Sequence, residues 1–119
     1  MKRFSSFASE YAFRTENEIE SFFNEKIDES PIYGLFSETS IMKLREFTMR
    51  RSMRLGPVFL VLSAQALKDF SKTEEKDLIK ASVGLELLHS SILISRDIIE
   101  DSDLDRGKSS IHKDFKKND

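Results

Sequence analysis

One stretch of this sequence decides the fold: ELLHSSILISRDIIEDSDLDRGKSSIH, residues 86–112. Its first half continues an apolar pattern of helical spacing that begins some fifteen residues upstream. That pattern opens at Ser71, which with Glu74 three residues later forms a capping-box signature for a helix N-terminus. We therefore expect one long helix as far as about Asp101, then an irregular piece ending at Gly107, and a short final helix.

Working outward toward the N-terminus, residues 57–68 are apolar on nearly all sides. Such a helix is stable when most of its surface is buried. The preceding Gly56-Pro57 breaks the chain, and proline is tolerated in the first turn of a helix. We therefore expect a new helix to begin at Pro57 and to lie in the core.

The first third of the chain predicts two further helices. Residues 4–27 have apolar residues at three- and four-residue steps, which indicates a long amphipathic helix, with an interruption expected near Arg14-Thr15. A turn follows over residues 28–34, because proline and glycine interrupt the pattern there. A second helix is expected from Ser37 or Ser40 to about residue 50. No stretch shows the alternation typical of strands, so we predict an all-α fold of about five helices.

The amino-acid composition limits the classes of protein to which this chain can belong. The chain has 119 residues, enough for one small domain, and its net charge of −2 gives no reason to expect a nucleic-acid partner. The absence of cysteine excludes disulfides and thiolate metal sites. The N-terminus lacks the apolar core of a signal peptide, and the longest apolar run is far shorter than the roughly 20 residues of a membrane span. We expect a cytoplasmic protein without a membrane span.

Several spaced positions identify a family. Glu-Leu-Leu-His at 86–89, an acidic cluster at 96–101, and Arg-Gly-Lys at 106–108 with His112 resemble the first aspartate-rich segment of trans-isoprenyl diphosphate synthases, the polyprenyl synthetase family. The resemblance extends over residues 44–115, whereas the first 40 residues, including the N-terminal helix expected over 1–30, match only in helical character. It implies a single truncated domain, 1–119, equivalent to the N-terminal portion of an isoprenoid synthase-type helical bundle.

The acidic cluster departs from the family pattern. The family's Asp-Asp-x-x-Asp, which implies a magnesium site, is here Arg96-Asp97-Ile-Ile-Glu100. Asp97, Glu100 and Asp101 could hold magnesium weakly, since hard oxygen ligands suit that ion. A cation ~4 Å from Arg96 would meet several kcal/mol of repulsion at an effective dielectric of about 20. The alternative is a solvated acidic helix end in which Arg96 pairs with Glu100.

The basic motif before residue 57 is also altered. The family's Gly-Gly-Lys-Arg-x-Arg-Pro corresponds to residues 51–57, with Met53 and Gly56 at the lysine and the arginine that bind isopentenyl diphosphate. Neither side chain can donate a hydrogen bond to a phosphate. The alternative for the remaining cations is an exposed basic helix face. It would comprise Lys43, Arg45, Arg50, Arg51 and Arg54.

Some binding positions are retained. The resemblance implies that His89 and Arg106 bind the diphosphate of the substrate, although His89 could also be structural. Asp105 stands at the family's allylic-diphosphate arginine, and Ser95 stands at the histidine before the acidic motif. The packing positions around these changes still suggest a core. They are Leu55, Pro57, Leu87, Leu88, Ile94, Ile98 and Ile99.

The lost ligands and the retained packing positions predict a catalytically impaired protein, for which we assign no catalytic residue. We expect a non-catalytic or modulating subunit of a prenyl diphosphate synthase, with magnesium bound only if the acidic site still functions. Its partner would be a second copy or a full-length synthase, and isopentenyl or allylic diphosphate is a possible ligand. The alternatives are a prenyltransferase half-site completed by another chain and a helical interaction module with no diphosphate role.

Overall fold

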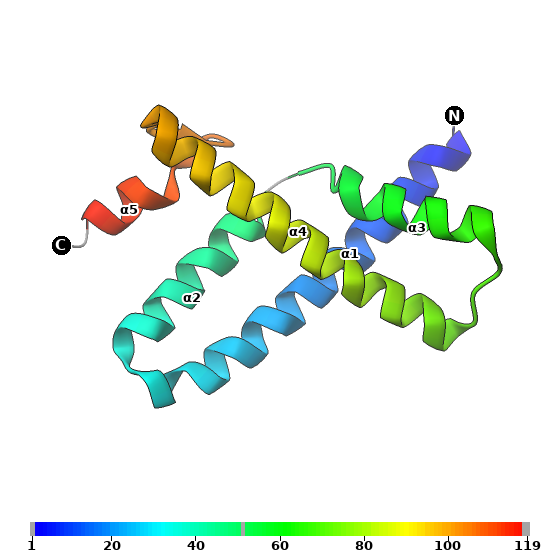
Figure 1. Ribbon diagram of the computed structural model, residues 1–119, viewed down its shortest axis with the longest axis horizontal. Coiled ribbons are helices and arrows are strands. Elements are labelled where there is room, and N and C mark those ends of the chain that lie inside the picture. Colours follow the sequence, from blue (N-terminus) through cyan, green and yellow to red (C-terminus); the bar gives the residue numbers. More distant parts are fainter. Residues whose placement is uncertain (1, 51, 118–119) are drawn as a thin grey trace.

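The computed structural model describes residues 2–50 and 52–117 (Figure 1). Within these ranges it contains five α-helices, one short 3-10 helix and a two-stranded hairpin. The helices are α1 (Lys2–Glu29), η1 (Ser30–Tyr33), α2 (Leu35–Thr48), α3 (Leu55–Leu67), α4 (Lys72–Glu100) and α5 (Ile111–Lys117), and the strands are β1 (Leu104–Asp105) and β2 (Lys108–Ser109). The predicted all-α fold is confirmed.

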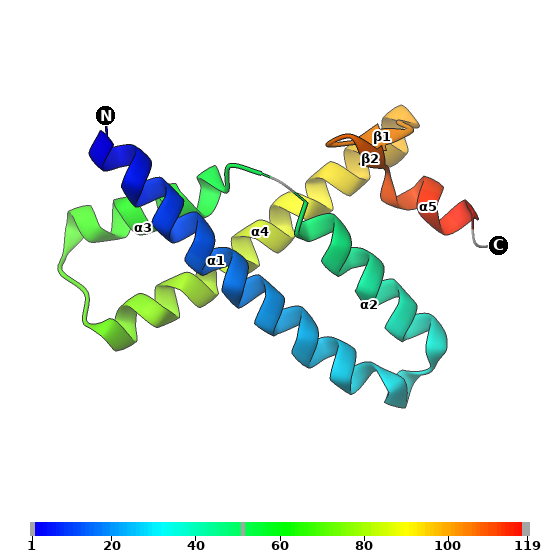
Figure 2. The same ribbon diagram turned by 180° about the vertical axis from the view of Figure 1, so that it is seen from behind.

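The helices form a thin body of 50 × 33 × 20 Å. The α1 and α2 helices run side by side in opposite directions, and α4 crosses them on the other side of the molecule (Figures 1 and 2). The α3 helix packs on both α1 and α4. The shortest dimension equals about two helix diameters, so the body has two layers.

The α1 helix is continuous, and the predicted interruption at Arg14-Thr15 is wrong. Thr15 is fully buried and stands in one stripe with Tyr11, Ile19 and Phe23, at four-residue steps. The stripe faces α3 and α4, and its burial outweighs the modest helix propensity of threonine.

The other helix boundaries follow local signals. Ser71 accepts a hydrogen bond from the backbone N–H of Glu74, as the capping signature predicts. The α2 helix begins at Leu35, earlier than predicted, directly after Gly34, whose φ of 100° suits glycine. The α3 helix begins two residues before Pro57, and Arg54 precedes it with a left-handed φ of 53°.

A two-residue hairpin replaces the irregular piece that the sequence predicts after α4. Leu104 pairs with Ser109, and Asp105 pairs with Lys108. Arg106 and Gly107 form the turn with φ values of 50° and 79°, as a two-residue hairpin turn requires. Strands this short cannot display an alternating pattern, so periodicity could not have revealed them.

The predicted core is only partly correct. Pro57 is buried, and Leu87 and Ile94 are partly buried. Four other predicted core residues are exposed, with accessible fractions of 43% for Leu55, 57% for Leu88, 54% for Ile98 and 83% for Ile99. Their positions have helical spacing, but no helix in the described ranges covers that face of α3 and α4.

The α4 helix is long and apolar enough to cross a membrane, by length and composition alone. The core helix of a water-soluble protein meets the same criteria. The buried face of α4 includes Glu86 and Asp97, as expected for a helix within a bundle. The absence of a membrane span stays a prediction.

One polar cluster joins α1, α3 and α4 near one end of the body. Tyr11 donates a hydrogen bond of 2.8 Å to Glu75 and accepts one of 3.0 Å from Gln65, and Arg14 donates to the same Glu75 carboxylate. The Arg14 guanidinium, and then the Tyr11 hydroxyl, hold the pKa of Glu75 below its ordinary value. Glu75 therefore stabilises the fold in its ionised form.

We expect Glu75 to contribute to the acid sensitivity of the fold. Because its folded-state pKa is lowered, its contribution is present above the ordinary pKa of a glutamate and is lost as pH falls through the folded-state value. Glu75→Gln should reduce the free energy of unfolding at pH 7 by about 1–2 kcal/mol. Urea unfolding at pH 7 and pH 3 measures both effects. Glu25→Gln, at an exposed position of α1, is the control, and an equal pH dependence in Glu75→Gln and the wild type would contradict this role.

Candidate functional site

A groove of about 470 Å³ lies between α4 and the segment that leads into α3. It is lined by Ser52, Met53, Leu55, Gly56, Leu85, Glu86, Leu88, His89 and Ile92. The fold thus brings together the altered basic motif and His89, which lie more than thirty residues apart in the sequence. His89 and Met53 are both exposed, so the groove is open to solvent.

The groove has no side-chain cation at the two altered positions. Met53 is 75% exposed and presents a thioether. Gly56 packs close to α4, because a Cβ atom added there would lie 3.3 Å from Cδ2 of Leu85. A longer side chain at position 56 would require Leu85 to move. The groove can therefore accept an apolar group more readily than a diphosphate.

Beneath the groove, a buried ion pair fixes the segment before α3 to α4. Nη1 of Arg54 donates a 2.7 Å hydrogen bond to Glu86, and the two side chains are 1% and 4% exposed. Arg54 also donates to the backbone carbonyl of Arg50 and lies 3.3 Å from Glu16. These contacts hold the left-handed backbone of Arg54 in place. Sequence reasoning missed this role of Glu86, although the motif containing it was identified.

The predicted exposed basic face is wrong for Arg50 and Arg54, which are 7% and 1% exposed. Arg50 pairs with Glu46 and donates to the backbone carbonyls of Asp105 and Ser109, at 3.1 and 2.7 Å. It therefore joins α2 to the β-hairpin.

The other cations of the predicted basic face form separate contacts. Lys43 pairs with Asp114, and Arg45 pairs with Glu20. Arg51 lies outside the described residues.

Arg106 is engaged with the protein itself. Its guanidinium donates to Asp105 at 2.8 Å and to the backbone carbonyls of Phe47 and Arg50 at 2.8 and 3.3 Å. It also lies over the Phe47 ring, as Arg50 does, each 4.9 Å from the ring centroid. Carbonyls at a helix C-terminus need donors, and Arg106 supplies them for α2. Arg106 is not among the residues that line the groove with His89, and its predicted diphosphate contact stays a prediction.

At the end of α4, Arg96 lies next to two carboxylates. One nitrogen of Arg96, Nη2, lies 3.8 Å from Asp97 and 3.6 Å from Asp105. These are the ion pairs of Arg96 among the described side chains, so the predicted pairing with Glu100 is wrong. Asp97 and Asp105 are 1% and 4% exposed. Burial raises the pKa of Asp97, and the nearby Asp105 carboxyl raises it further.

The other two predicted magnesium ligands are directed elsewhere. Glu100 is exposed. Asp101 ends α4 in a left-handed conformation and contacts Lys113 at 2.7 Å and His112 at 3.4 Å. Lys113, and then His112, hold the pKa of Asp101 below its ordinary value.

These donors do not fit magnesium. Within residues 2–50 and 52–117, no three histidine or acidic side chains are grouped to hold a metal ion. Magnesium takes six oxygen ligands around one point, waters included, and Arg96 occupies the space beside Asp97. The assignment of Asp97, Glu100 and Asp101 to a metal stays a prediction, which the metal titration below tests.

Comparison with known proteins places these features in context. A family model described as Polyprenyl synthetase matches residues 41–119. A geranylfarnesyl diphosphate synthase of Natronomonas pharaonis is 32% identical over 74 residues, covering 52% of this chain and 22% of that protein. A heptaprenyl diphosphate synthase component 2 of Geobacillus stearothermophilus is 29% identical over 111 residues, covering 93% of this chain and 30% of that protein. The chain thus spans less than a third of each relative. No solved structure matches it.

Proposed function

Since the chain belongs to the polyprenyl synthetase family, we propose that it acts in isoprenoid biosynthesis as a non-catalytic or modulating subunit of a prenyl diphosphate synthase. The observation that carries this proposal is the groove, in which Met53 and Gly56 stand beside His89. A site for isopentenyl diphosphate needs several cationic donors, and these two residues supply none. In our proposal the chain keeps the scaffold of the site and lacks its strongest phosphate contacts.

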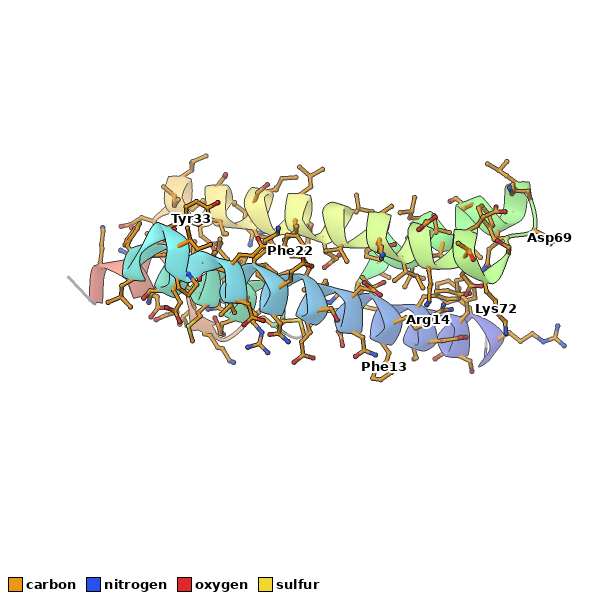
Figure 3. The ribbon with its side chains drawn as sticks, turned by 90° about the horizontal axis from the view of Figure 1, so that it is seen from below. Phe13, Arg14, Phe22, Tyr33, Asp69 and Lys72 are labelled. Atoms are coloured by element: carbon orange, nitrogen blue, oxygen red, sulfur yellow. The ribbon has the colours of Figure 1, made fainter. Side chains whose placement is uncertain are left out.

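An exposed apolar face supports a role as a subunit. Leu88, Ile92 and Ile99 lie on one side of α4, opposite its buried face, and are 57%, 57% and 83% exposed. Figure 3 shows side chains of α4 projecting away from the layer that contains α1. We call these three residues the outer stripe of α4. Apolar side chains arranged in this way on a helix are typical of a face that packs against another helix.

The name of one relative favours a hetero-oligomer. That relative is described as component 2 of a heptaprenyl diphosphate synthase, a name that implies at least one other component. We propose that this chain likewise binds a prenyl diphosphate synthase chain through the outer stripe, in the cytoplasm. A homo-oligomer through the same stripe is the second candidate, favoured by the same exposed residues.

Activity measurements with and without the partner test this proposal. We expect no prenyl transfer from isopentenyl and allylic diphosphates by the purified chain with magnesium. Addition of the chain should change the rate or product length of a prenyl diphosphate synthase from the same cell. Turnover by the chain alone would overturn the proposal. Turnover only with a partner that is itself inactive would instead establish a half-site completed by another chain.

Calorimetry addresses the residual diphosphate site. If His89 retains its predicted contact, isopentenyl diphosphate should bind weakly, and His89→Ala should remove that binding. If the wild-type chain shows no heat of binding in saturating ligand, the helical interaction module without a diphosphate role becomes the preferred function.

Restoring a cation at position 53 should strengthen diphosphate binding. Met53→Lys places an ammonium group at the mouth of the groove that contains His89. A charge-assisted hydrogen bond contributes roughly 1.5–3 kcal/mol, so we expect affinity for isopentenyl diphosphate to rise about 10- to 100-fold. Calorimetry measures the change. Met42→Lys, at an exposed methionine of α2, is the matched control, and an equal gain there would show that net charge alone is responsible.

A further inference from the structure

Two departures from the family pattern meet in space. Arg96 stands where the pattern has an aspartate, and Asp105 stands where it has an arginine. The structure brings Nη2 of Arg96 to 3.6 Å from Oδ2 of Asp105. The two positions therefore carry the opposite charges to those of the family pattern, and in this chain they form an ion pair between α4 and the β-hairpin.

The carboxylates in this cluster are buried and incompletely paired. Oδ1 of Asp105 accepts from Arg106 at 2.8 Å, and Oδ1 of Asp97 lies 3.8 Å from Arg96. The Oδ2 atoms of both aspartates are buried without a hydrogen-bond partner among the described residues. Buried carboxylate oxygens need a cation or a donor, so this cluster is a place where positive charge is favourable.

We propose that the guanidinium of Arg96 is the resident cation of the Asp97–Asp105 pair and excludes divalent metal ions from the end of α4. One nitrogen of Arg96 lies within 4 Å of both carboxylates, so the guanidinium lies beside the space that an ion bound to both would need. The guanidinium is always charged, and because it is part of the protein it cannot dissociate from the site as a free ion can. Arg96 remains 54% exposed, and its exposed part shields the carboxylates from ions in solution.

Removing this guanidinium should create metal binding that the wild-type chain lacks. Mn²⁺ is the probe, because its paramagnetism reports binding without any activity assay. We expect Arg96→Met to bind Mn²⁺ with a dissociation constant of roughly 10⁻⁴–10⁻³ M, the weak end of the range for carboxylate sites, because only two carboxylates contribute. Wild-type protein should show at least tenfold weaker binding. Arg96→Met/Asp105→Asn should lose the acquired affinity, because one of the two carboxylates is gone.

Further variants separate this proposal from general charge effects and from misfolding. Arg45→Met removes a partly exposed arginine of α2 that pairs with Glu20, and it should not create Mn²⁺ binding. Arg96→Lys keeps the cation and should continue to exclude Mn²⁺, even if Arg96→Met does not fold. Binding of Mn²⁺ by the wild-type chain or by Arg96→Lys as tightly as by Arg96→Met would overturn the proposal. Failure of a folded Arg96→Met to bind Mn²⁺ would overturn it too. Neither result bears on the subunit function proposed above.

Discussion

Replacing Glu86 with leucine should lower the free energy of unfolding by about 3–5 kcal/mol, because it leaves the Arg54 guanidinium buried without its main counter-ion. Arg54 is 1% exposed and lies 2.7 Å from Glu86. Among the described residues, this is the ion pair whose two side chains are both almost fully buried. A domain of this size is stabilised by roughly 5–15 kcal/mol, so the loss is a large part of the total. Urea unfolding followed by circular dichroism measures it.

The backbone at Arg54 adds to this cost. A non-glycine residue in the left-handed region is strained by about 1–3 kcal/mol and is held there by its surroundings. Without Glu86, the segment before α3 can relax, and the groove that contains His89 should lose its shape.

A double replacement serves as the control. Arg54→Met/Glu86→Leu removes both buried charges and should recover most of the stability lost in Glu86→Leu, since well-packed apolar side chains can substitute for a buried ion pair. Glu16 loses a partner at 3.3 Å in that variant, but its side chain is 36% exposed and remains hydrated. A loss below about 1 kcal/mol in Glu86→Leu would show that the ion pair contributes little to the fold.

Replacing Ile92 with aspartate should weaken association with a partner by about 30-fold or more, with little effect on the fold. Ile92 is 57% exposed in the middle of the outer stripe. Central apolar residues of an interface commonly contribute 2 kcal/mol or more to binding, and each 1.4 kcal/mol corresponds to a factor of about ten. Surface substitutions typically change folding stability by about 0.5 kcal/mol or less. Sedimentation velocity and calorimetry with the purified synthase measure association.

Phe13 provides the matched control for this experiment. It is 63% exposed and lies on α1, and in Figure 3 it points away from α4, on the opposite side of the body. Phe13→Asp introduces the same charge in place of a large apolar side chain but should leave association unchanged. A wild-type chain that is monomeric at micromolar concentration and binds no synthase would contradict the subunit proposal. Equal losses in the two variants would contradict the assignment of the interface to the outer stripe.

Much of the fold could be predicted because the helices follow from local sequence patterns. The capping signature at Ser71 and the helical spacing along α4 require no knowledge of neighbours. The incorrect predictions concern burial, which depends on the elements that pack against a residue. Ile99 has the spacing of a core residue, yet periodicity identifies only the apolar face of a helix and cannot tell whether another element covers it. Arg54 lies in a basic run, and only the fold shows that Glu86 is beneath it.

The residues of the candidate site could be predicted from the sequence, but not all of their contacts. The resemblance named Met53, Gly56 and His89, and the fold places them along one groove. It could not reveal the contact between Arg96 and Asp105, because residues nine apart across a helix end have no fixed relation until the hairpin that follows is known. In the sequence, Arg96 and Asp105 are two separate losses of a ligand, whereas in the structure they form one ion pair.

The thinness of the body, 20 Å in its shortest dimension, limits what the chain can do unaided. Allylic carbocations are destroyed by water, so an enzyme that forms them must keep the growing hydrocarbon in a dry chamber. Two helical layers share one apolar interface, and its buried side chains form two clusters. In the proposed subunit, a hydrocarbon would therefore lie between this chain and its partner, with each protein shielding one side of it from water.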